Sequence, residues 1–250
     1  MSYISSPWSF DVGERFQKNS SLTAIPASQY GTLSFWFKLA PKTTPRAIFR
    51  TNTNCFTINA TADTNGKFGL SIIAKNYING QVGYVSPVPE FDAGVWHHLC
   101  VSWASAVVSP GKGFDLFIDD VKYLKTIDTG SLASLTWNQT SQLSIGAAIN
   151  GGTDAPGSYT EWWMMTGIWP NFTLDFDIEA NRRKFIDTDK HPVDLGLNGE
   201  LPTGISPILY LGSNAGFGVN RGMGGNFMVI GNVTTDPDLP YLVDFPIYFV

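Results

Sequence analysis

Three carboxylates alternate along the stretch Asp-Phe-Asp-Ile-Glu at residues 175–179. On a β-strand, alternate side chains lie on one face, so Asp175, Asp177 and Glu179 could supply the acid and the nucleophile of a glycoside hydrolase. The same residues also fit the start of a helix over residues 178–187, with Asp177 as its N-cap and Glu179 in the first turn. The sequence that follows, IEANRRKFID, favours the helix. We therefore predict no catalytic residue.

Two adjacent histidines, His97 and His98, are the next candidates for chemistry. On a strand they point to opposite faces, and we expect one to be hydrogen-bonded in the core and the other to be exposed. No second ligand lies at metal-binding spacing, so we predict no metal residue. The Asp119–Asp120 pair and the turn at residues 63–66 could supply oxygen ligands to Ca²⁺. Ordinary turn hydrogen bonding explains both equally, so calcium stays open and no other cofactor is expected.

Aromatic residues are concentrated around Tyr159, Trp162 and Trp163. Exposed aromatic rings can stack on sugar rings, and large exposed apolar side chains usually mark a binding surface. Sandwich cores also contain many Trp residues, and strand alternation sends Trp162 and Trp163 to opposite faces. We take these three residues as the candidate ligand-binding residues, with packing in the core or at a subunit interface as the favoured alternative.

Short strands with period-two alternation account for most of the chain. The length of 250 residues, with 43% hydrophobic and 14% aromatic residues, suits a single domain with a full two-sheet core. The sequence predicts an all-β, two-sheet antiparallel sandwich with one short helix. We expect its strands at residues 8–10, 31–39, 46–50, 54–60, 66–75, 81–85, 96–103, 114–119, 142–146, 161–169, 208–212 and 227–231.

Residues 94–121 carry the most specific pattern. A strand that opens Trp-x-His-hydrophobic is followed by a loop and by a second strand that closes Ile-Asp-Asp. With the Ser-Phe-Trp-Phe of residues 34–37, this pattern resembles the core of laminin-G-like and concanavalin A-like jelly rolls. Those proteins usually have Gly where this chain has Asp120, and the glucanases among them have Glu where it has Asp175. The resemblance implies a jelly roll, a fold that carries lectins, glucanases, adhesins and structural modules.

A second block, ANRRKFID…PVDLGLNGELPTGISPILYL…NRGMGGNF, follows the sandwich pattern. It resembles a segment found after the sandwich core in proteins of tailed phages and prophages, which implies a virion context. The positions that fit are Asn181, Arg182, Arg183, Phe185, 192–196, Gly199, 202–204 and 222–227.

Composition excludes several kinds of partner. The net charge is −5 and no basic run is interleaved with aromatic residues, which argues against nucleic acid. No apolar run approaches the ~20 residues that span a bilayer, so we expect no membrane insertion. The N-terminal residues do not resemble a secretory signal, and Cys55 and Cys100 are expected to be buried free thiols. We predict a protein made in a host cytoplasm and located in a virion.

The C-terminal residues 234–250 contain three prolines and many large apolar side chains, which rules out a helix or a central strand through them. We expect residues 1–233 to form the jelly-roll domain and residues 234–250 an extended tail. Such a tail must bury its apolar side chains, either on its own sandwich or on a neighbouring subunit. We favour the neighbour. The predicted partner interface is Leu239, Tyr241, Leu242, Val243, Phe245, Ile247, Tyr248, Phe249 and Val250.

Taken together, these patterns predict a non-enzymatic phage virion protein, either a head decoration protein or a tail component. It would support the particle or contact the host surface, with other virion proteins and further copies of itself as partners. The alternative is a glycan-binding lectin of the tail that recognises host-surface glycans, and a glucan hydrolase is a third possibility.

Overall fold

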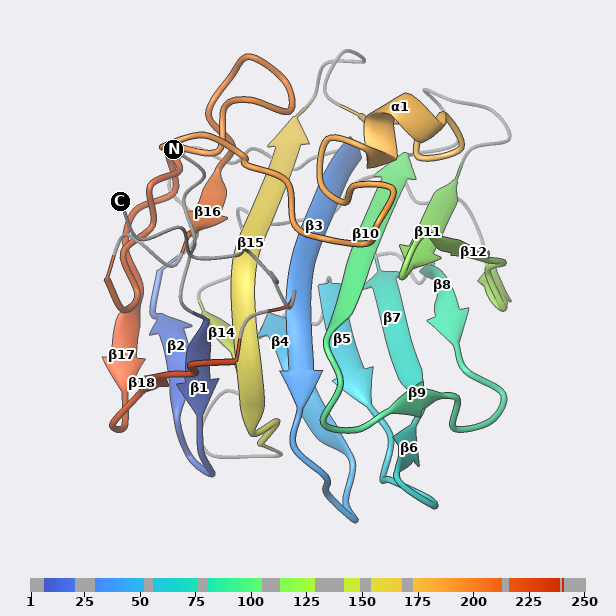
Figure 1. Ribbon diagram of the computed structural model, residues 1–250, viewed down its shortest axis with the longest axis vertical. Helices are drawn as coiled ribbons and strands as arrows, with labels where there is room; N and C mark the ends of the chain where they lie inside the picture. The colour runs from blue at the N-terminus through green and yellow to red at the C-terminus, as the bar shows by residue number, and fades with distance from the viewer. Residues whose placement is uncertain are drawn as a thin grey trace, which may run out of the picture.

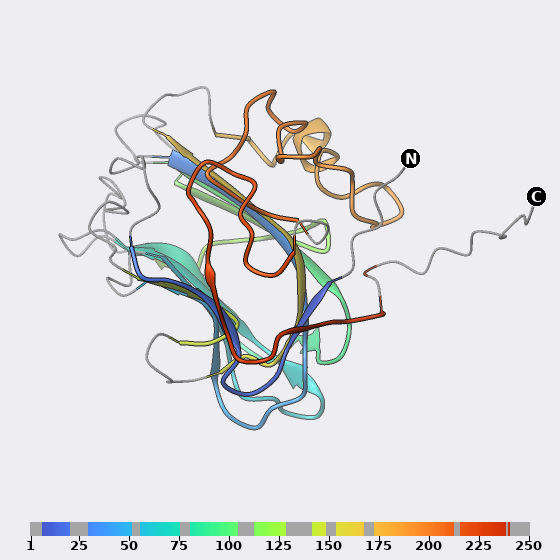
Figure 2. The ribbon, with the colours of Figure 1, turned by 90° about the vertical axis from the view of Figure 1, so that its left-hand side faces the viewer.

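The computed structural model describes residues 7–20, 30–51, 56–75, 81–104, 113–128, 142–148, 154–167, 173–212, 216–238 and 240. Within these residues, two antiparallel sheets of eight strands each face one another (Figures 1 and 2). The predicted two-sheet β-sandwich with one short helix is therefore confirmed. No helix in the described part of the chain has the length and apolar character needed to cross a membrane.

The first sheet, sheet A, has the strand order β12-β11-β10-β3-β15-β1-β18, and β16 also pairs with β15. The predicted central hairpin is confirmed, because β10 and β11 pair in antiparallel register from Leu99 opposite Ile118 to Trp103 opposite Phe114. The strands are β1 (Trp8–Phe10), β3 (Tyr30–Leu39), β10 (His97–Ala104), β11 (Phe114–Ile118), β12 (Val121–Tyr123), β15 (Gly157–Gly167), β16 (Leu209–Leu211) and β18 (Thr234–Thr235).

The second sheet, sheet B, has the order β13-β8-β7-β5-β4-β14-β2-β17, and a separate two-stranded sheet pairs β6 with β9. Its strands are β2 (Arg15–Lys18), β4 (Arg46–Thr51), β5 (Phe56–Ala60), β7 (Leu70–Lys75), β8 (Gln81–Val85), β13 (Ile127–Asp128), β14 (Leu143–Ile145) and β17 (Met228–Ile230), with β6 (Lys67–Phe68) and β9 (Phe91–Asp92) beside them.

Apolar side chains at alternate positions fill the space between the two sheets. On β3 these are Leu33, Phe35 and Phe37, all fully buried. The ring of Phe35 stacks on Trp162 of β15 with centroids 3.7 Å apart. Trp162 also lies against Phe49 of sheet B, at 5.7 Å, so aromatic contacts join the two layers. Burial of each such side chain contributes about 1.5–3 kcal/mol.

A second, smaller core lies on the other face of sheet A. Residues 173–205, which we call the cover segment, lie over this face (Figures 1 and 2). Phe176, Phe185 and Leu195 of the cover segment pack there against Trp163 and other side chains of the sheet. The nearly continuous apolar sequence of β15 is explained by this arrangement, because the strand is buried on both faces.

The helix of the cover segment is shorter than predicted. α1 spans only Glu179–Arg182, and its N-cap is Ile178, with no side-chain cap hydrogen bond. The prediction of a helix over residues 178–187 capped by Asp177 is therefore wrong. The carboxylate of Asp177 instead lies 2.5 Å from Lys122 Nζ of β12. Asp177 therefore forms an ion pair with the sandwich and does not cap the helix.

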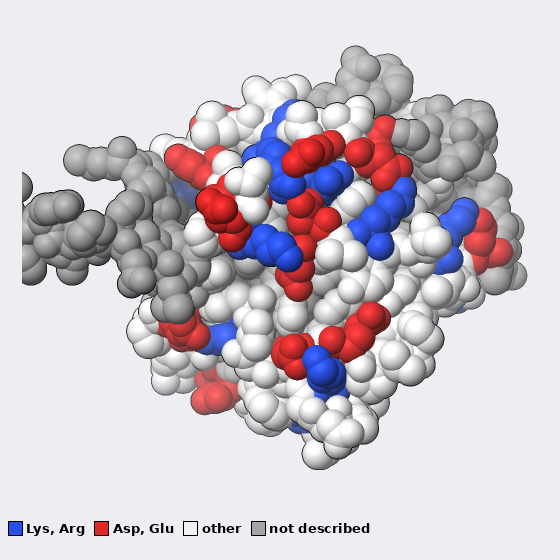
Figure 3. Space-filling model, turned by 45° about the vertical axis from the view of Figure 1, so that its right-hand side comes forward, with Lys and Arg blue, Asp and Glu red and all other residues white. Residues whose placement is uncertain are grey.

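Asp120 holds the cover segment to the sandwich. Its two carboxylate oxygens accept hydrogen bonds from Arg182 Nε at 2.5 Å and Arg183 Nη2 at 2.6 Å. Figure 3 shows acidic and basic side chains interleaved over this region of the surface. Burial alone would raise the pKa of Asp120, but the hydrogen bonds from Arg183 and Arg182 outweigh it and hold the pKa below its usual value.

The same residue also forms a tight turn. Asp119 and Asp120 are the two residues between β11 and β12, with φ angles of 51° and 66°. A two-residue hairpin turn of this kind requires a left-handed backbone at both positions, which Gly, Asn and Asp tolerate best. Asp120 adopts the conformation of the glycine that is usual in this pattern and adds a carboxylate that glycine lacks.

We expect Asp120→Asn to release the cover segment. The amide keeps the turn but loses both ion pairs, and hydrogen bonds to charged groups are worth about 1.5–3 kcal/mol. Because the folded pKa of Asp120 is depressed, its contribution is present above the unfolded pKa of ~3.9 and is lost as pH falls through the folded pKa. Limited proteolysis at neutral pH should cleave the variant faster within residues 173–205. The exposed Asp189→Asn is the matched control, and equal cleavage rates in both variants would contradict the clamp.

Candidate functional site

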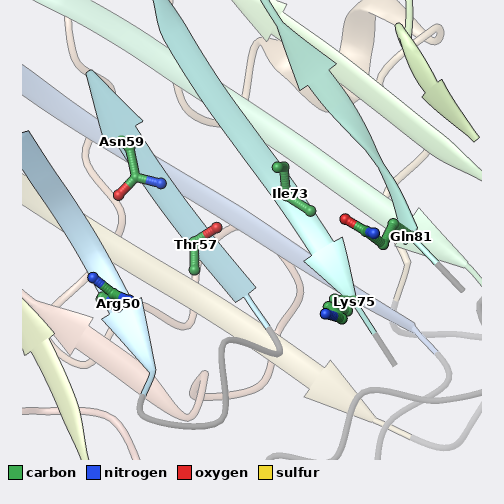
Figure 4. Close-up of a pocket in the computed structure, with 6 residues that line it drawn as sticks. All are labelled: Arg50, Thr57, Asn59, Ile73, Lys75 and Gln81. Carbon is green, nitrogen blue, oxygen red and sulfur yellow. The ribbon is translucent and has the colours of Figure 1, made fainter. Parts of the chain in front are cut away.

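The outer face of sheet B carries a polar hollow of about 280 Å³. It lies over β4, β5, β7 and β8, and Figure 4 shows its six side chains on one face of these strands. A volume of this size is close to the lower end of the ~300–1,000 Å³ range of small-ligand pockets. The residues that line it are Arg50, Thr57, Asn59, Ile73, Lys75 and Gln81.

Strand register places these side chains together. Arg50 lies opposite Thr57, Thr57 opposite Ile73, and Ile73 opposite Gly83, so one row crosses four strands. Directly opposed residues share a face of the sheet, so this row points away from the core. Its last member, Gly83, has no side chain, and a Cβ there would lie 2.2 Å from the Ile72 carbonyl oxygen. Lys75 and Gln81 form a second opposed pair at one end of the row.

The chemistry of this groove is that of a hydrogen-bonding surface. Arg50 and Lys75 are cationic, Thr57, Asn59 and Gln81 are neutral donors and acceptors, and Ile73 supplies an apolar contact. All six are half-buried, which fixes their stems while leaving their polar ends reachable. Such a surface can bind a polar ligand through several directed hydrogen bonds.

Sequence patterns located the groove's strands but not the groove. Phe49, Ile58 and Ile72 were recognisable as apolar positions, and the structure buries all three completely. Their polar neighbours looked like ordinary solvent-facing residues. The sequence feature that could have indicated the groove is that Arg50 and Asn59 occupy outward positions on adjacent strands. These residues can be recognised as neighbours only when the strand register is known.

Tyr159, Trp162 and Trp163, the candidate sugar-binding residues, have no exposed surface in the structure. The Tyr159 hydroxyl donates to Ala155 O at 2.8 Å, and Trp163 Nε1 donates to Gly199 O of the cover segment at 2.7 Å. A fully buried ring cannot stack on a sugar, so the sugar-stacking hypothesis is corrected in favour of core packing.

A β-bulge explains how all three rings become buried. The register of β15 against β3 shifts between Thr160 and Trp163, and Glu161, in the bulge, has a φ of 53°. This extra residue leaves Tyr159 and Trp162 on the inner face, although they are three positions apart. Trp163 then points outward, under the cover segment.

The carboxylates of residues 175–179 do not lie on a strand. Asp175 and Asp177 are in the turn before α1, and Glu179 pairs with Arg183 at 2.9 Å. Oxygens of Asp175, Asp177 and Asp115 lie within 4.8 Å of one another. Lys122 already provides a positive charge to this group, 3.6 Å from Asp115 and 2.5 Å from Asp177. The arrangement differs from the strand-borne acid pair that the glycosidase hypothesis requires.

The carboxylates considered for calcium are engaged by protein groups. Asp63 pairs with Arg46 and accepts a hydrogen bond from Lys42 N at 2.7 Å. Asp119 accepts hydrogen bonds from the ring of His97 at 2.7 Å and from His98 N at 2.8 Å. Hydrogen bonds and ion pairs within the protein therefore explain why both turns contain carboxylates. This is the explanation that the sequence offered as the alternative to calcium binding.

Both neighbouring histidines are buried, which corrects the expectation that one is exposed. His97 lies beside the aromatic rings of the inner core and donates to Asp119 Oδ2 at 2.7 Å and to Asp92 O at 3.0 Å. Burial alone would lower the pKa of His97, but the hydrogen bonds to Asp119 and Asp92 O and the charges of both carboxylates together outweigh it and raise the pKa. The two rings do point to opposite faces, as predicted.

His98 and Cys100 lie together on the outer face of sheet A but are unsuited to nucleophilic catalysis. His98 Nε2 is 2.8 Å from Ser34 Oγ and 3.7 Å from Cys100 Sγ. Burial lowers the pKa of His98 to about 3 and raises the pKa of the Cys100 thiol well above its usual range. A reactive cysteine needs a lowered pKa, so this thiol is inert. Cys100 is a free, buried thiol as predicted, and Cys55 lies outside the described residues.

The start of the expected tail joins the sandwich. Thr234–Thr235 form β18, which pairs with β1 at the edge of sheet A. Lys38 Nζ of β3 then binds the carboxylates of Asp236 at 2.7 Å and Asp238 at 2.8 Å. The nine residues of the predicted partner interface lie outside the described residues. They are Leu239 and eight residues within 241–250.

Comparisons with known proteins support the fold. The family model described as the concanavalin A-like lectin/glucanases superfamily matches residues 16–166, more than half of the chain. No curated protein sequence matches. A solved structure of a proposed carbohydrate binding protein from Bacteroides ovatus has a TM-score of 0.60 at 12% identity, covering 93% of this chain and 60% of that one.

A second similar structure is tailspike protein 2 from Escherichia coli O157:H7 bacteriophage CAB120. It has a TM-score of 0.50 at 13% identity, over 82% of this chain and 27% of the tailspike. The chain thus spans less than two thirds of either solved protein. At these identities the likeness concerns the fold alone.

Because His98 is buried and its pKa is lowered, we predict that the folded protein loses stability at acidic pH. Its folded pKa of about 3 lies below the unfolded value of ~6.5, so the unfolded chain takes up the proton first. Its contribution to stability is fully present above pH 6.5 and falls by about 1.4 kcal/mol per pH unit below it. His98→Gln should remove this slope in urea unfolding measured from pH 4.5 to 7.5. The half-buried His191→Gln, in the cover segment, should keep it, and an unchanged slope in His98→Gln would refute the assignment.

Proposed function

Because the chain belongs to the concanavalin A-like lectin/glucanases superfamily, we propose that it is a non-catalytic binding module whose groove on sheet B binds carbohydrate. The observation that carries this proposal is the row of outward polar side chains over β4, β5, β7 and β8. The fold shared with the Bacteroides ovatus carbohydrate binding protein is consistent with it.

The groove offers what a saccharide needs. Thr57, Asn59 and Gln81 can donate to and accept from sugar hydroxyls, and their strands hold them at fixed spacings. Ile73 provides an apolar contact for the C–H face of a sugar ring. Strands β4, β5 and β7 are joined by backbone pairing at the groove residues, so the surface is preformed and little ordering is required on binding.

The groove also lacks the groups for sugar hydrolysis. Glycoside hydrolysis requires two carboxylates on either side of the scissile bond. Among the described residues that line the groove, none is Asp or Glu. Binding without turnover is therefore the activity that this surface supports.

Asn59→Ala tests the proposal most directly. Removing one well-placed amide from a bound sugar should cost about 1.4 kcal/mol, or roughly tenfold in Kd. Glycans bound by the full chain on an array would be measured by calorimetry against both the variant and Asn232→Ala, an exposed asparagine outside the groove. We expect weakened binding for Asn59→Ala alone and no release of reducing sugar. An array without any bound glycan, or equal affinities in both variants, would refute the proposal.

We also propose that the module is part of a tailed-phage virion, made in the host cytoplasm and joined to other virion proteins and to copies of itself. The cover segment and the Gly-rich residues 222–227 carry the sequence pattern that resembles phage and prophage proteins. The fold shared with a phage tailspike is consistent with this context. Head decoration or a tail position would both place a glycan-binding face at the host surface.

Residues 239–250 are the proposed contact to the neighbouring subunit. Since Asp236 and Asp238 are held by Lys38, a truncation should retain both and remove only residues 239–250. We expect the shortened chain to keep its melting temperature, to be monomeric by light scattering and to fail to join particles. A full-length chain with Leu242, Phe245 and Phe249 changed to Ser should behave in the same way. A fall of ~10 °C or more in melting temperature would instead place this segment in its own core.

A further inference from the structure

We propose that residues 239–250 of one copy bind the next copy at an apolar rim of the cover segment, with Asp244 paired to Arg221. This inference rests on the proposed subunit contact and names the surface that receives it. The rim consists of four exposed apolar side chains around Pro207, namely Leu197, Leu201, Ile205 and Met223. The observation that carries the inference is that Arg221, two residues from Met223, has a side chain without a partner.

The segments that form the rim are packed together. Met223 N donates to Pro207 O at 2.9 Å, and Arg221 N donates to Tyr210 O at 2.9 Å, so these two segments lie side by side. The loop that carries the other three rim residues reaches the same point, because a Cβ on Gly199 would lie 3.0 Å from Pro207 Cγ. The rim and Arg221 are therefore parts of one surface.

The apolar side chains of the rim are held in solvent. Their exposed fractions range from 45% for Ile205 to 61% for Leu201. Hydrogen bonds within the loop fix its shape, since Leu201 N donates to Leu195 O at 3.1 Å and Gly204 N donates to Glu200 O at 2.7 Å. A grouping of large exposed apolar side chains usually marks an interaction surface.

Arg221 adds an unmatched charge to this surface. It is half-buried, and its Nε is buried without a hydrogen-bond partner. Among the residues that the structure describes, none forms an ion pair with its guanidinium. Arg182 and Arg183, by contrast, both pair with Asp120. A buried donor without a partner costs free energy, so a carboxylate from another chain would stabilise Arg221.

Residues 239–250 are complementary to this surface in composition and charge. Their sequence is LPYLVDFPIYFV, in which Asp244 is the one charged side chain. Val243 and Phe245 flank it. A guanidinium binds a carboxylate through two parallel hydrogen bonds, and arginine is enriched among the residues that dominate binding at interfaces. Asp244 can therefore pair with Arg221 while its apolar neighbours cover the rim.

The rim and the residues that precede this segment lie on the same side of the sandwich (Figure 2). Lys38 holds Asp236 and Asp238 on the outer face of sheet A. The rim loop packs on that face, where Gly199 O accepts a hydrogen bond from Trp163 Nε1. The twelve residues 239–250 span at most about 40 Å when extended. Two copies that face each other through this side can therefore exchange these segments reciprocally, which closes the pair.

Charge reversal tests the pairing in the full-length chain. Association would be measured by sedimentation over a range of concentrations. Arg221→Glu and Asp244→Arg should each weaken association at least tenfold, because each brings like charges together. A mixture of the two variants should recover it, since the changed segment of one then meets the changed rim of the other. Lys190→Glu, an exposed lysine of the cover segment, is the matched control and should associate like the unaltered chain.

The outcomes separate this inference from the proposed subunit contact. Association that is lost on removal of residues 239–250 but unchanged in Arg221→Glu and Asp244→Arg would overturn the named surface and leave the subunit contact intact. A full-length chain that is monomeric at every concentration would overturn both. Failure of the mixture to associate would also overturn the inference, because a segment bound to its own rim cannot be rescued by another chain. Melting temperatures would verify folding, and Asp244→Arg tests the pair alone if Arg221→Glu does not fold.

Discussion

Burial of sheet A on both faces is the constraint on which the rest of the structure depends. Strand β15 presents Tyr159 and Trp162 to sheet B and Trp163 and Met165 to the opposite side, and all four are buried. An apolar outer face of this kind would be an aggregation surface if it were left in water. The cover segment is therefore required by the sheet beneath it, and Asp120 ties it down through Arg182 and Arg183.

This asymmetry decides where binding can occur. The cover segment excludes ligands from much of the outer face of sheet A, and the aromatic rings there serve packing. The outer face of sheet B carries the hollow instead, and its outward positions there are polar, as Thr57 and Asn59 show. His98 and Cys100 are residue types that often act in catalysis, but burial shifts the pKa values of both side chains so that the thiol is unreactive. The polar side chains that line the hollow on sheet B are only half-buried, so a ligand can reach them.

The sequence was informative where local pattern and tertiary structure agree. Alternation located β3, β10 and β11, because one pleated face of each meets the core. It missed short strands such as β2, which have too few residues to establish a period. It also missed the bulge at Glu161, since one inserted residue breaks the alternation without leaving a Gly or Pro marker. The groove was invisible because its residues are brought together by the register of neighbouring strands, which the alternation pattern alone does not give.

The groove and the last described residues before the proposed subunit contact lie on opposite sides of the sandwich. The groove lies on the outer face of sheet B, whereas Lys38 holds Asp236 and Asp238 on the outer face of sheet A. Trp96 Nε1 also donates to the Asp238 carbonyl at 3.2 Å, which gives this segment a further contact with the sandwich. A subunit attached from that point would present sheet B away from its neighbour. Attachment and ligand binding would then not compete for surface, and many copies on one particle could bind weak glycan ligands together, gaining avidity without any new contact.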